Sequence, residues 1–126
     1  MKEENSTLKD LTRIAQAVYD KKGSNTLIID VRNISTMTDY FIIAEGTVDR
    51  HVKAISNTII DELAQLKRTP LHVEGQQEGD WVVVDYGDYV IHLFTPELRE
   101  KYALEELWRK GQVVDVKIDT ANPTNK

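Results

Sequence analysis

The chain has no cysteine, and this absence excludes disulfide bonds and thiolate chemistry. No apolar run approaches the ~20 residues that a membrane-spanning helix needs, and Met1–Asn5 lacks the apolar core of a signal peptide. The glycines form no phosphate-binding loop, because Lys22-Gly23-Ser24 lacks the P-loop pattern. At 126 residues, the chain is expected to form one cytoplasmic domain over residues 1–118, followed by a flexible tail over 119–126.

Positive charge is scarce in the second half of the chain. The net charge is −5, and the segment Arg68–Pro96 carries one arginine and no lysine against five acidic residues: Glu74, Glu78, Asp80, Asp85 and Asp88. Nucleic-acid binding depends on lysine and arginine that neutralise phosphates. This segment is therefore expected to repel RNA and to attract a basic protein surface; Lys67 and Arg68 leave room for a small basic patch beside it.

Periodicity predicts the secondary structure. Apolar residues at helical spacing predict a first helix capped by Ser6 or Thr7 and a long second helix capped by Thr47. Thr95-Pro96 predicts the start of a third helix, whose apolar side includes Tyr102 and Trp108. Alternating or continuous apolar runs predict strands over residues 26–31, 39–44, 71–73 and 81–94. Residues 113–118 also alternate and are a candidate for one further strand.

The predicted order of helices and strands is α-β-β-α-β-β-β-α. It indicates an α/β (α+β) domain with a mixed β-sheet flanked by helices. We expect the helices to cover one face of the sheet and to leave the other face or an edge available for binding.

The segment Trp81–Phe94 predicts a β-hairpin whose turn is Tyr86-Gly87-Asp88. Asp85 and Asp88 are candidates for an acid–base pair, but their spacing across a tight turn favours hydrogen bonds to the turn backbone. Trp81 and Tyr86 are five positions apart, so we expect them on opposite faces, each either in the core or in a contact surface.

Few residues point to catalysis or metal binding. His51, His72 and His92 have no metal-ligand spacing, which favours hydrogen-bonded or surface imidazoles. Gly23-Ser24 followed by Asp30 has a faint similarity to nucleotidyltransferases, but Arg32 occupies the position of the second carboxylate that a magnesium site needs. We therefore predict no enzyme activity, no catalytic residue, no metal and no cofactor.

Several motifs together resemble one known family. They are Thr38–Ala44 with Gly46, Arg50-His51-Val52, Glu74-Gly75, Trp81–Asp88, Val90-Ile91-His92 and Leu104–Trp108. In this order they are similar to the ribosomal silencing factor family, also called RsfS or Iojap. The resemblance covers about residues 8–108.

The resemblance implies a nucleotidyltransferase-like fold without the catalytic residues, in proteins that are commonly homodimers. It implies binding to the large ribosomal subunit through ribosomal protein fourteen, without direct sequence-specific contact with nucleic acid. Such binding would block joining of the small subunit and repress translation when nutrients are scarce. An acidic, aromatic surface suits a basic ribosomal protein.

The resemblance also suggests roles for single residues. Trp81 matches the family's contact tryptophan, and Asp85, Tyr86, Gly87 and Asp88 match its hairpin motif. The remaining matches have no assigned role: Asp39, Tyr40, Arg50, His51 and His92. For Arg50, a buried pair with a carboxylate is the structural alternative. The alternative functions are a factor in assembly of the large subunit and, more distantly, a nucleotidyltransferase.

Overall fold

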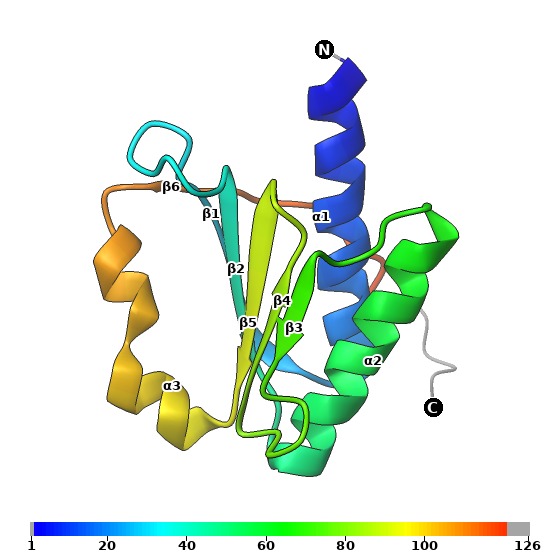
Figure 1. Ribbon diagram of the computed structural model, residues 1–126, viewed down its shortest axis with the longest axis vertical. Coiled ribbons are helices and arrows are strands. Elements are labelled where there is room, and N and C mark those ends of the chain that lie inside the picture. Colours follow the sequence, from blue (N-terminus) through cyan, green and yellow to red (C-terminus); the bar gives the residue numbers. More distant parts are fainter. Residues whose placement is uncertain (1, 121–126) are drawn as a thin grey trace.

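The computed structural model describes residues 2–120 and shows one mixed β-sheet with helices on both sides (Figure 1). The elements are, in chain order, α1 (Lys2–Asp20), β1 (Ser24–Asp30), β2 (Tyr40–Glu45), α2 (Asp49–Gln65), β3 (His72–Glu74), β4 (Trp81–Asp85), β5 (Tyr89–Phe94), α3 (Pro96–Tyr102), the 3-10 helix η1 (Leu104–Trp108) and β6 (Gln112–Val113). The predicted α/β class and the predicted order of the main elements are confirmed. Among the described helices, none has the length and apolar character needed to cross a bilayer.

The sheet has the strand order β3-β4-β5-β2-β1-β6. Strands β2 and β5 are parallel, and every other neighbouring pair is antiparallel. In the β4–β5 hairpin, Trp81 pairs with Phe94 and Asp85 with Val90, which leaves 86–88 as the connecting turn. The predicted hairpin is therefore confirmed.

The two long helices cover one face of the sheet. Leu11, Ile14 and Val18 of α1 and Ile55 and Ile59 of α2 are almost completely buried against it. Burial of one such side chain contributes about 1.5–3 kcal/mol to folding. This layer contains the larger of the two buried apolar clusters.

The expectation that helices cover only one face is wrong. Helix α3 and η1 lie on the face opposite α1 and α2 (Figure 1), where Leu98 and Leu104 pack against a second apolar cluster that includes Phe41 and Ile43. The reason lies in β2, whose first five residues are all buried. A strand that is apolar on both faces requires cover on both faces. The side chain of Trp108, predicted to pack here, lies outside the described residues.

The predicted helix caps are also corrected. Helix α1 begins at Lys2, so Ser6 and Thr7 lie inside it. Helix α2 has Val48 as its N-cap residue instead of Thr47, and Thr95 is the N-cap of α3, but its hydroxyl accepts no capping hydrogen bond from the helix. Thr47 lies one residue before the N-cap, and both its backbone N–H and its hydroxyl are close to His51 Nδ1, at 2.8 and 3.2 Å.

The C-terminal segment adds a short edge strand and then crosses α1. Of the strand expected over 113–118, Val113 pairs with β1, together with Gln112 just before it, while Val116 and Ile118 pack against the main core. The backbone N–H of Asp119 donates to Gln16 Oε1 at 2.7 Å. Residues 121–126 of the expected tail lie outside the described residues.

Candidate functional site

Alternate residues of β4 face the side of the sheet opposite α1 and α2. Val82 and Val84 are buried under the two long helices, whereas Trp81, Val83 and Asp85 are only partly buried on the other side. This alternation follows from the two-residue period of a strand. We call the strip formed by Trp81, Val83 and Asp85 together with Val90 and His92 of β5 the open face; Val90 and His92 are also partly buried.

Trp81 is partly buried and packs against the second apolar cluster. Its ring lies 5.1 Å from that of Phe94 and 4.9 Å from that of Tyr102, centroid to centroid. Its indole N–H donates to His92 Nδ1 at 3.0 Å. Since this donor is already satisfied within the domain, the exposed part of the ring offers apolar contact area, which suits an aromatic anchor in a protein interface.

His92 accepts the hydrogen bond from the indole N–H of Trp81. Burial lowers the pKa of His92 from 6.5 to about 4, and the nearby Asp85 carboxylate raises it only in part. The imidazole is therefore neutral at physiological pH. A neutral ring with Nδ1 as acceptor carries its proton on Nε2, so the hydrogen bond to Trp81 persists across the physiological range.

Asp85 is a turn residue. Its Oδ1 accepts a hydrogen bond from the backbone N–H of Gly87 at 2.8 Å, and Gly87 has a φ of 88° that favours glycine. The backbone carbonyl of Asp88 accepts from the N–H groups of Asp39 and Tyr40, at 3.0 and 3.2 Å. The turn role predicted for Asp85 is confirmed, and the same turn fixes the start of β2.

Tyr86 lies on the opposite face from Trp81, as the spacing predicts. It packs against the main core, with its ring 5.2 Å from that of Tyr89. The five residues of β4 place its two ends roughly 13 Å apart. Of the predicted partner-binding residues, Trp81 and Asp85 therefore share the open face, Asp88 is exposed at the turn, and Tyr86 belongs to a different environment.

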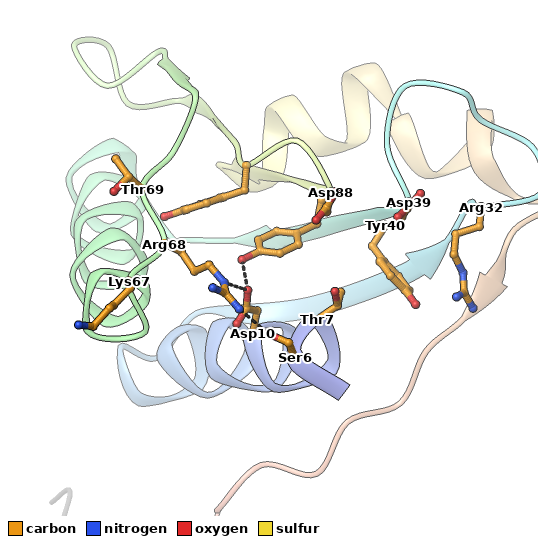
Figure 2. A pocket seen from close by; sticks show the side chains of 12 residues that line it. Ser6, Thr7, Asp10, Arg32, Asp39, Tyr40, Lys67, Arg68, Thr69 and Asp88 are labelled. Atoms are coloured by element: carbon orange, nitrogen blue, oxygen red, sulfur yellow. Dashed lines mark hydrogen bonds and ion pairs between the residues drawn. The ribbon is translucent and has the colours of Figure 1, made fainter. Parts of the chain in front are cut away.

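That environment is a polar groove of about 760 Å³ at the turn end of the sheet. In Figure 2, Ser6, Thr7 and Asp10 of α1 lie on one side, and Lys67, Arg68 and Thr69, just beyond α2, lie on another. The remaining side is formed by Arg32, Asp39, Tyr40 and Asp88. We call this space the α1–turn groove; its lining also includes Tyr86 and Tyr89.

The α1–turn groove contains a polar cluster formed by Asp10, Arg68 and Tyr89, of which Asp10 and Tyr89 are buried and Arg68 is partly exposed. Asp10 Oδ2 accepts from Arg68 Nε at 2.8 Å and from the Tyr89 hydroxyl at 2.6 Å, and the Asp10 side chain is 3% exposed. The guanidinium of Arg68 also donates to the Ser6 hydroxyl. Burial raises the pKa of the Tyr89 hydroxyl well above its usual value, with a further rise from its hydrogen bond to Asp10.

The sequence did not predict this cluster, and it indicated Arg68 only as part of a small basic patch with Lys67. A signal for Asp10 exists, because it is spaced four and seven positions from the buried Ile14 and Ala17 on one helix face. A charged residue on an apolar stripe requires a buried partner. Nothing in the local sequence identifies that partner, since Arg68 lies 58 positions away and Tyr89 lies 79 positions away.

His51 and Arg50 lie at the start of α2, at the end of the sheet away from the groove (Figure 1). His51 Nε2 lies 2.6 Å from the carbonyl oxygen of Lys21 while Nδ1 accepts from Thr47, so this imidazole ties α2 to the end of α1. Arg50 is exposed, and the buried pair considered for it is wrong.

Asp30 makes a bidentate ion pair with Arg32. The two Asp30 carboxylate oxygens lie 3.0 and 2.7 Å from Arg32 Nε and Nη2, and this contact is the main cause that lowers the pKa of Asp30. Both oxygens that a metal would need are thus engaged by a guanidinium. Within residues 2–120, no three His, Asp or Glu side chains gather as a metal cluster would require.

The geometry describes a mixed α/β domain with an aromatic open face that carries acidic residues along its β3–β4 side. Comparisons with known proteins agree with this class. A family model described as "Ribosomal silencing factor during starvation" matches residues 4–126. The chain belongs to this family of ribosomal silencing factors.

Individual relatives support the assignment. The chain is 37% identical over 109 residues to "Ribosomal silencing factor RsfS" of Bacillus subtilis, covering 86% of this chain and 92% of the relative. It is 34% identical over 102 residues to "Mitochondrial assembly of ribosomal large subunit protein 1" of Mus musculus, covering 79% of this chain and 45% of the relative. A crystal structure of a protein from Chromobacterium violaceum superposes with a TM-score of 0.78 at 30% identity and covers 92% of this chain and 96% of that one.

Proposed function

We propose that this protein binds the large ribosomal subunit through its open face, with ribosomal protein fourteen as the direct partner. Its bulk then blocks joining of the small subunit and represses translation when nutrients are limited. The mechanism is steric and requires no reaction. The observation that carries the proposal is Trp81, an aromatic anchor whose polar atom is satisfied internally and whose ring stays partly exposed on a sheet face.

Charge supports a basic partner. Glu74, Glu78 and Asp80 are all exposed on the segment that leads into β4. Exposed charge of one sign steers association with a surface of the opposite sign and discriminates against acidic partners. In this proposal Trp81 and Val83 supply contact area, while the acidic border and Asp88 at the turn select a basic protein. The homodimer implied by the family belongs to the same proposal.

Co-sedimentation tests the proposal directly. The purified protein is mixed with isolated large subunits, small subunits or whole ribosomes, and small subunits are then added to the loaded large subunits. Selective binding to large subunits that prevents joining is the expected result. Absence of binding to large subunits contradicts the proposal, and the sedimentation of the free protein reports whether it is a dimer.

Trp81→Ala is expected to weaken binding to large subunits by about thirtyfold, which corresponds to the ~2 kcal/mol typical of an aromatic hot spot. Because Trp81 also packs on Phe94, Val83→Lys serves as a second variant that places a positive charge at the centre of the open face. Tyr19→Ala, on an exposed part of α1, is the matched control. Unchanged binding by folded Trp81→Ala and Val83→Lys would place the docking surface elsewhere.

The mouse relative's name supports a second candidate, a role in assembly of the large subunit. The two functions share the docking surface and differ in their consequence. Loss of an assembly factor yields immature large subunits during growth. Loss of a silencing factor leaves mature subunits and unrestrained translation under starvation. Sucrose-gradient profiles of a deletion strain in both conditions separate the two.

A further inference from the structure

Helix α3 places a second aromatic ring beside Trp81. Tyr102, the last residue of α3, is 46% exposed, and its ring lies 4.9 Å from that of Trp81, centroid to centroid. Trp81 is itself only partly buried, so the two rings form one aromatic patch that is partly open to solvent. Aromatic rings at a surface provide a large contact area at a low cost in side-chain entropy. The patch continues the open face from the sheet onto α3.

The position of Tyr102 depends on how α3 is held on the sheet. The helix has seven residues, and none of them is buried. Leu98 is only partly buried where it packs against the second apolar cluster. A helix of this length is not stable by itself. Contacts with the rest of the domain must therefore fix its place.

Arg99 supplies such contacts. Its side chain is 11% exposed, and its guanidinium donates to Glu105 Oε2 at 3.2 Å, to Glu45 Oε2 at 3.3 Å and to the carbonyl oxygen of Asn25. These acceptors belong to η1, β2 and β1, so one side chain joins α3 to three other elements. A planar guanidinium suits this role, because it holds several acceptors in a fixed geometry. We call Arg99, Glu45 and Glu105 the Arg99 cluster.

The charges around α3 favour a basic partner. The exposed charged side chains of the helix are Glu97, Glu100 and Lys101, two acidic against one basic. The backbone N–H of Thr95, the N-cap residue of α3, donates to the carbonyl oxygen of Asp80 at 3.0 Å. The helix therefore begins beside the acidic segment that leads into β4. A surface bordered by negative charge on both segments attracts a basic protein and repels the phosphates of RNA.

We propose that Tyr102 is a second contact residue for the basic protein of the large subunit, beside Trp81, and that Arg99 is the positioning residue that fixes it there. The inference rests on the proposed function and extends the surface that carries it onto a helix. Arg99 acts through α3 and does not itself contact the partner. A side chain that only stabilised the domain would leave the Trp81–Tyr102 pair unchanged, and this difference can be measured.

The positioning role is tested on the free protein, without ribosomes. The ¹H–¹⁵N signal of the Trp81 indole, assigned with Trp81→Phe, is sensitive to the ring of Tyr102 at 4.9 Å. Tyr102→Ala is expected to shift this signal. Arg99→Gln is expected to shift it in the same direction, because it leaves the two carboxylates of the Arg99 cluster without a counter-charge and displaces α3. Arg109→Gln is the matched control and is expected to leave the signal in place, since Arg109 is 78% exposed and lies 3.6 Å from Glu106.

Arg99→Lys is the second variant, in case Arg99→Gln does not fold. It keeps the positive charge beside the two carboxylates but lacks the planar fork that holds three acceptors. The same shift of the Trp81 signal is expected at a smaller size. Melting temperatures identify the variants that are folded, and an unchanged Trp81 signal in a folded Arg99 variant would overturn the positioning role.

The contact role is tested by co-sedimentation titrations with large subunits. Tyr102→Ala is expected to raise the dissociation constant about tenfold. Tyr19→Ala removes a tyrosine of similar exposure, 41%, from α1 and is expected to leave it unchanged. Arg99→Gln is expected to raise it about fivefold. The combined variant is expected to bind no more weakly than Tyr102→Ala alone, because Arg99 acts through the same ring.

Two results would overturn the inference and leave the proposed function intact. In the first, Trp81→Ala weakens binding to large subunits but Tyr102→Ala matches Tyr19→Ala. In the second, the losses caused by Arg99→Gln and Tyr102→Ala add in the combined variant, which would mean that Arg99 affects binding by another route. Failure of the wild type to bind large subunits would instead overturn the proposed function, and the contact role with it.

Discussion

His92 illustrates how one residue prepares another for contact. Its ring accepts the indole proton of Trp81 at 3.0 Å and packs 4.6 Å from the ring of Phe41. If His92 became protonated, both ring nitrogens would be donors and the hydrogen bond to Trp81 would be lost. The orientation of the tryptophan on the open face therefore depends on a neutral imidazole.

The depressed pKa of His92 predicts a pH dependence of folding stability. The folded pKa is about 4, below the ordinary value of 6.5 that applies to the unfolded chain. The unfolded state therefore binds more protons than the folded state between these values, and stability falls as the pH falls from 6.5 to 4. The full effect is about 3 kcal/mol. Chemical unfolding at pH 7.5, 5.5 and 4.5 measures the decline.

His92→Gln removes the titrating group and is expected to flatten the decline between pH 6.5 and 4.5. His72→Gln is the control, because His72 is 61% exposed and its side chain pairs with the exposed Glu74. A titration of the His92 ring signals with a midpoint near 6.5 would contradict the prediction.

At the scale of elements, the helices and strands could be predicted from periodicity. Their buried apolar residues recur at the spacing of a helix or of a strand, so the pattern is visible in the sequence. The Trp81–Phe94 hairpin was predictable because Gly87 supplies the positive φ that its turn requires. The helix starts were predicted incorrectly at two positions, because Ser6 and Thr7 lie inside α1 and the N-cap of α2 is Val48, which has no side-chain hydroxyl to signal it. The position of α3 was missed, although the unbroken apolar run of β2 pointed to cover on both faces.

Gly75 controls how β3 joins β4. Its φ is 86°, and an added Cβ would lie 2.0 Å from the carbonyl oxygen of Trp81. Gly87 has a similar φ of 88°, but its added Cβ would meet only the side chain of Leu71 at 3.2 Å, and Leu71 is 74% exposed. Both substitutions to alanine incur the cost of a positive φ, about 1–2 kcal/mol. Only Gly75→Ala adds a backbone collision.

Urea unfolding is expected to show a loss of about 1–2 kcal/mol for Gly87→Ala and a clearly larger loss for Gly75→Ala. Gly75→Ala is also expected to shift the fluorescence of Trp81, because the collision moves the first residue of β4. Equal losses for the two variants would show that the β3–β4 connection absorbs the added methyl group.

At the scale of the whole molecule, the open face and the α1–turn groove occupy opposite sides of one strand. The hairpin that carries the open face could be predicted from the sequence, because β4 and β5 are close together in the chain. The groove was not, because α1, the end of α2 and the β4–β5 turn meet there only after folding (Figure 2). The Asp10–Arg68–Tyr89 cluster joins these three parts, so its energy contributes to the docking of both long helices on the sheet.

The two tyrosines of the groove allow this contribution to be measured with matched substitutions. Tyr89→Phe removes a hydroxyl that donates to the buried carboxylate of Asp10 at 2.6 Å, whereas Tyr86→Phe removes one that has no partner among the described residues. Loss of a hydrogen bond to a buried charge costs about 1.5–3 kcal/mol, but loss of an unpaired hydroxyl costs nothing or is stabilising. Thermal unfolding of both variants is expected to show a lower melting temperature for Tyr89→Phe alone. Equal losses would contradict the prediction, because the hydrogen bond from Tyr89 to Asp10 would then contribute no more to stability than the hydroxyl of Tyr86.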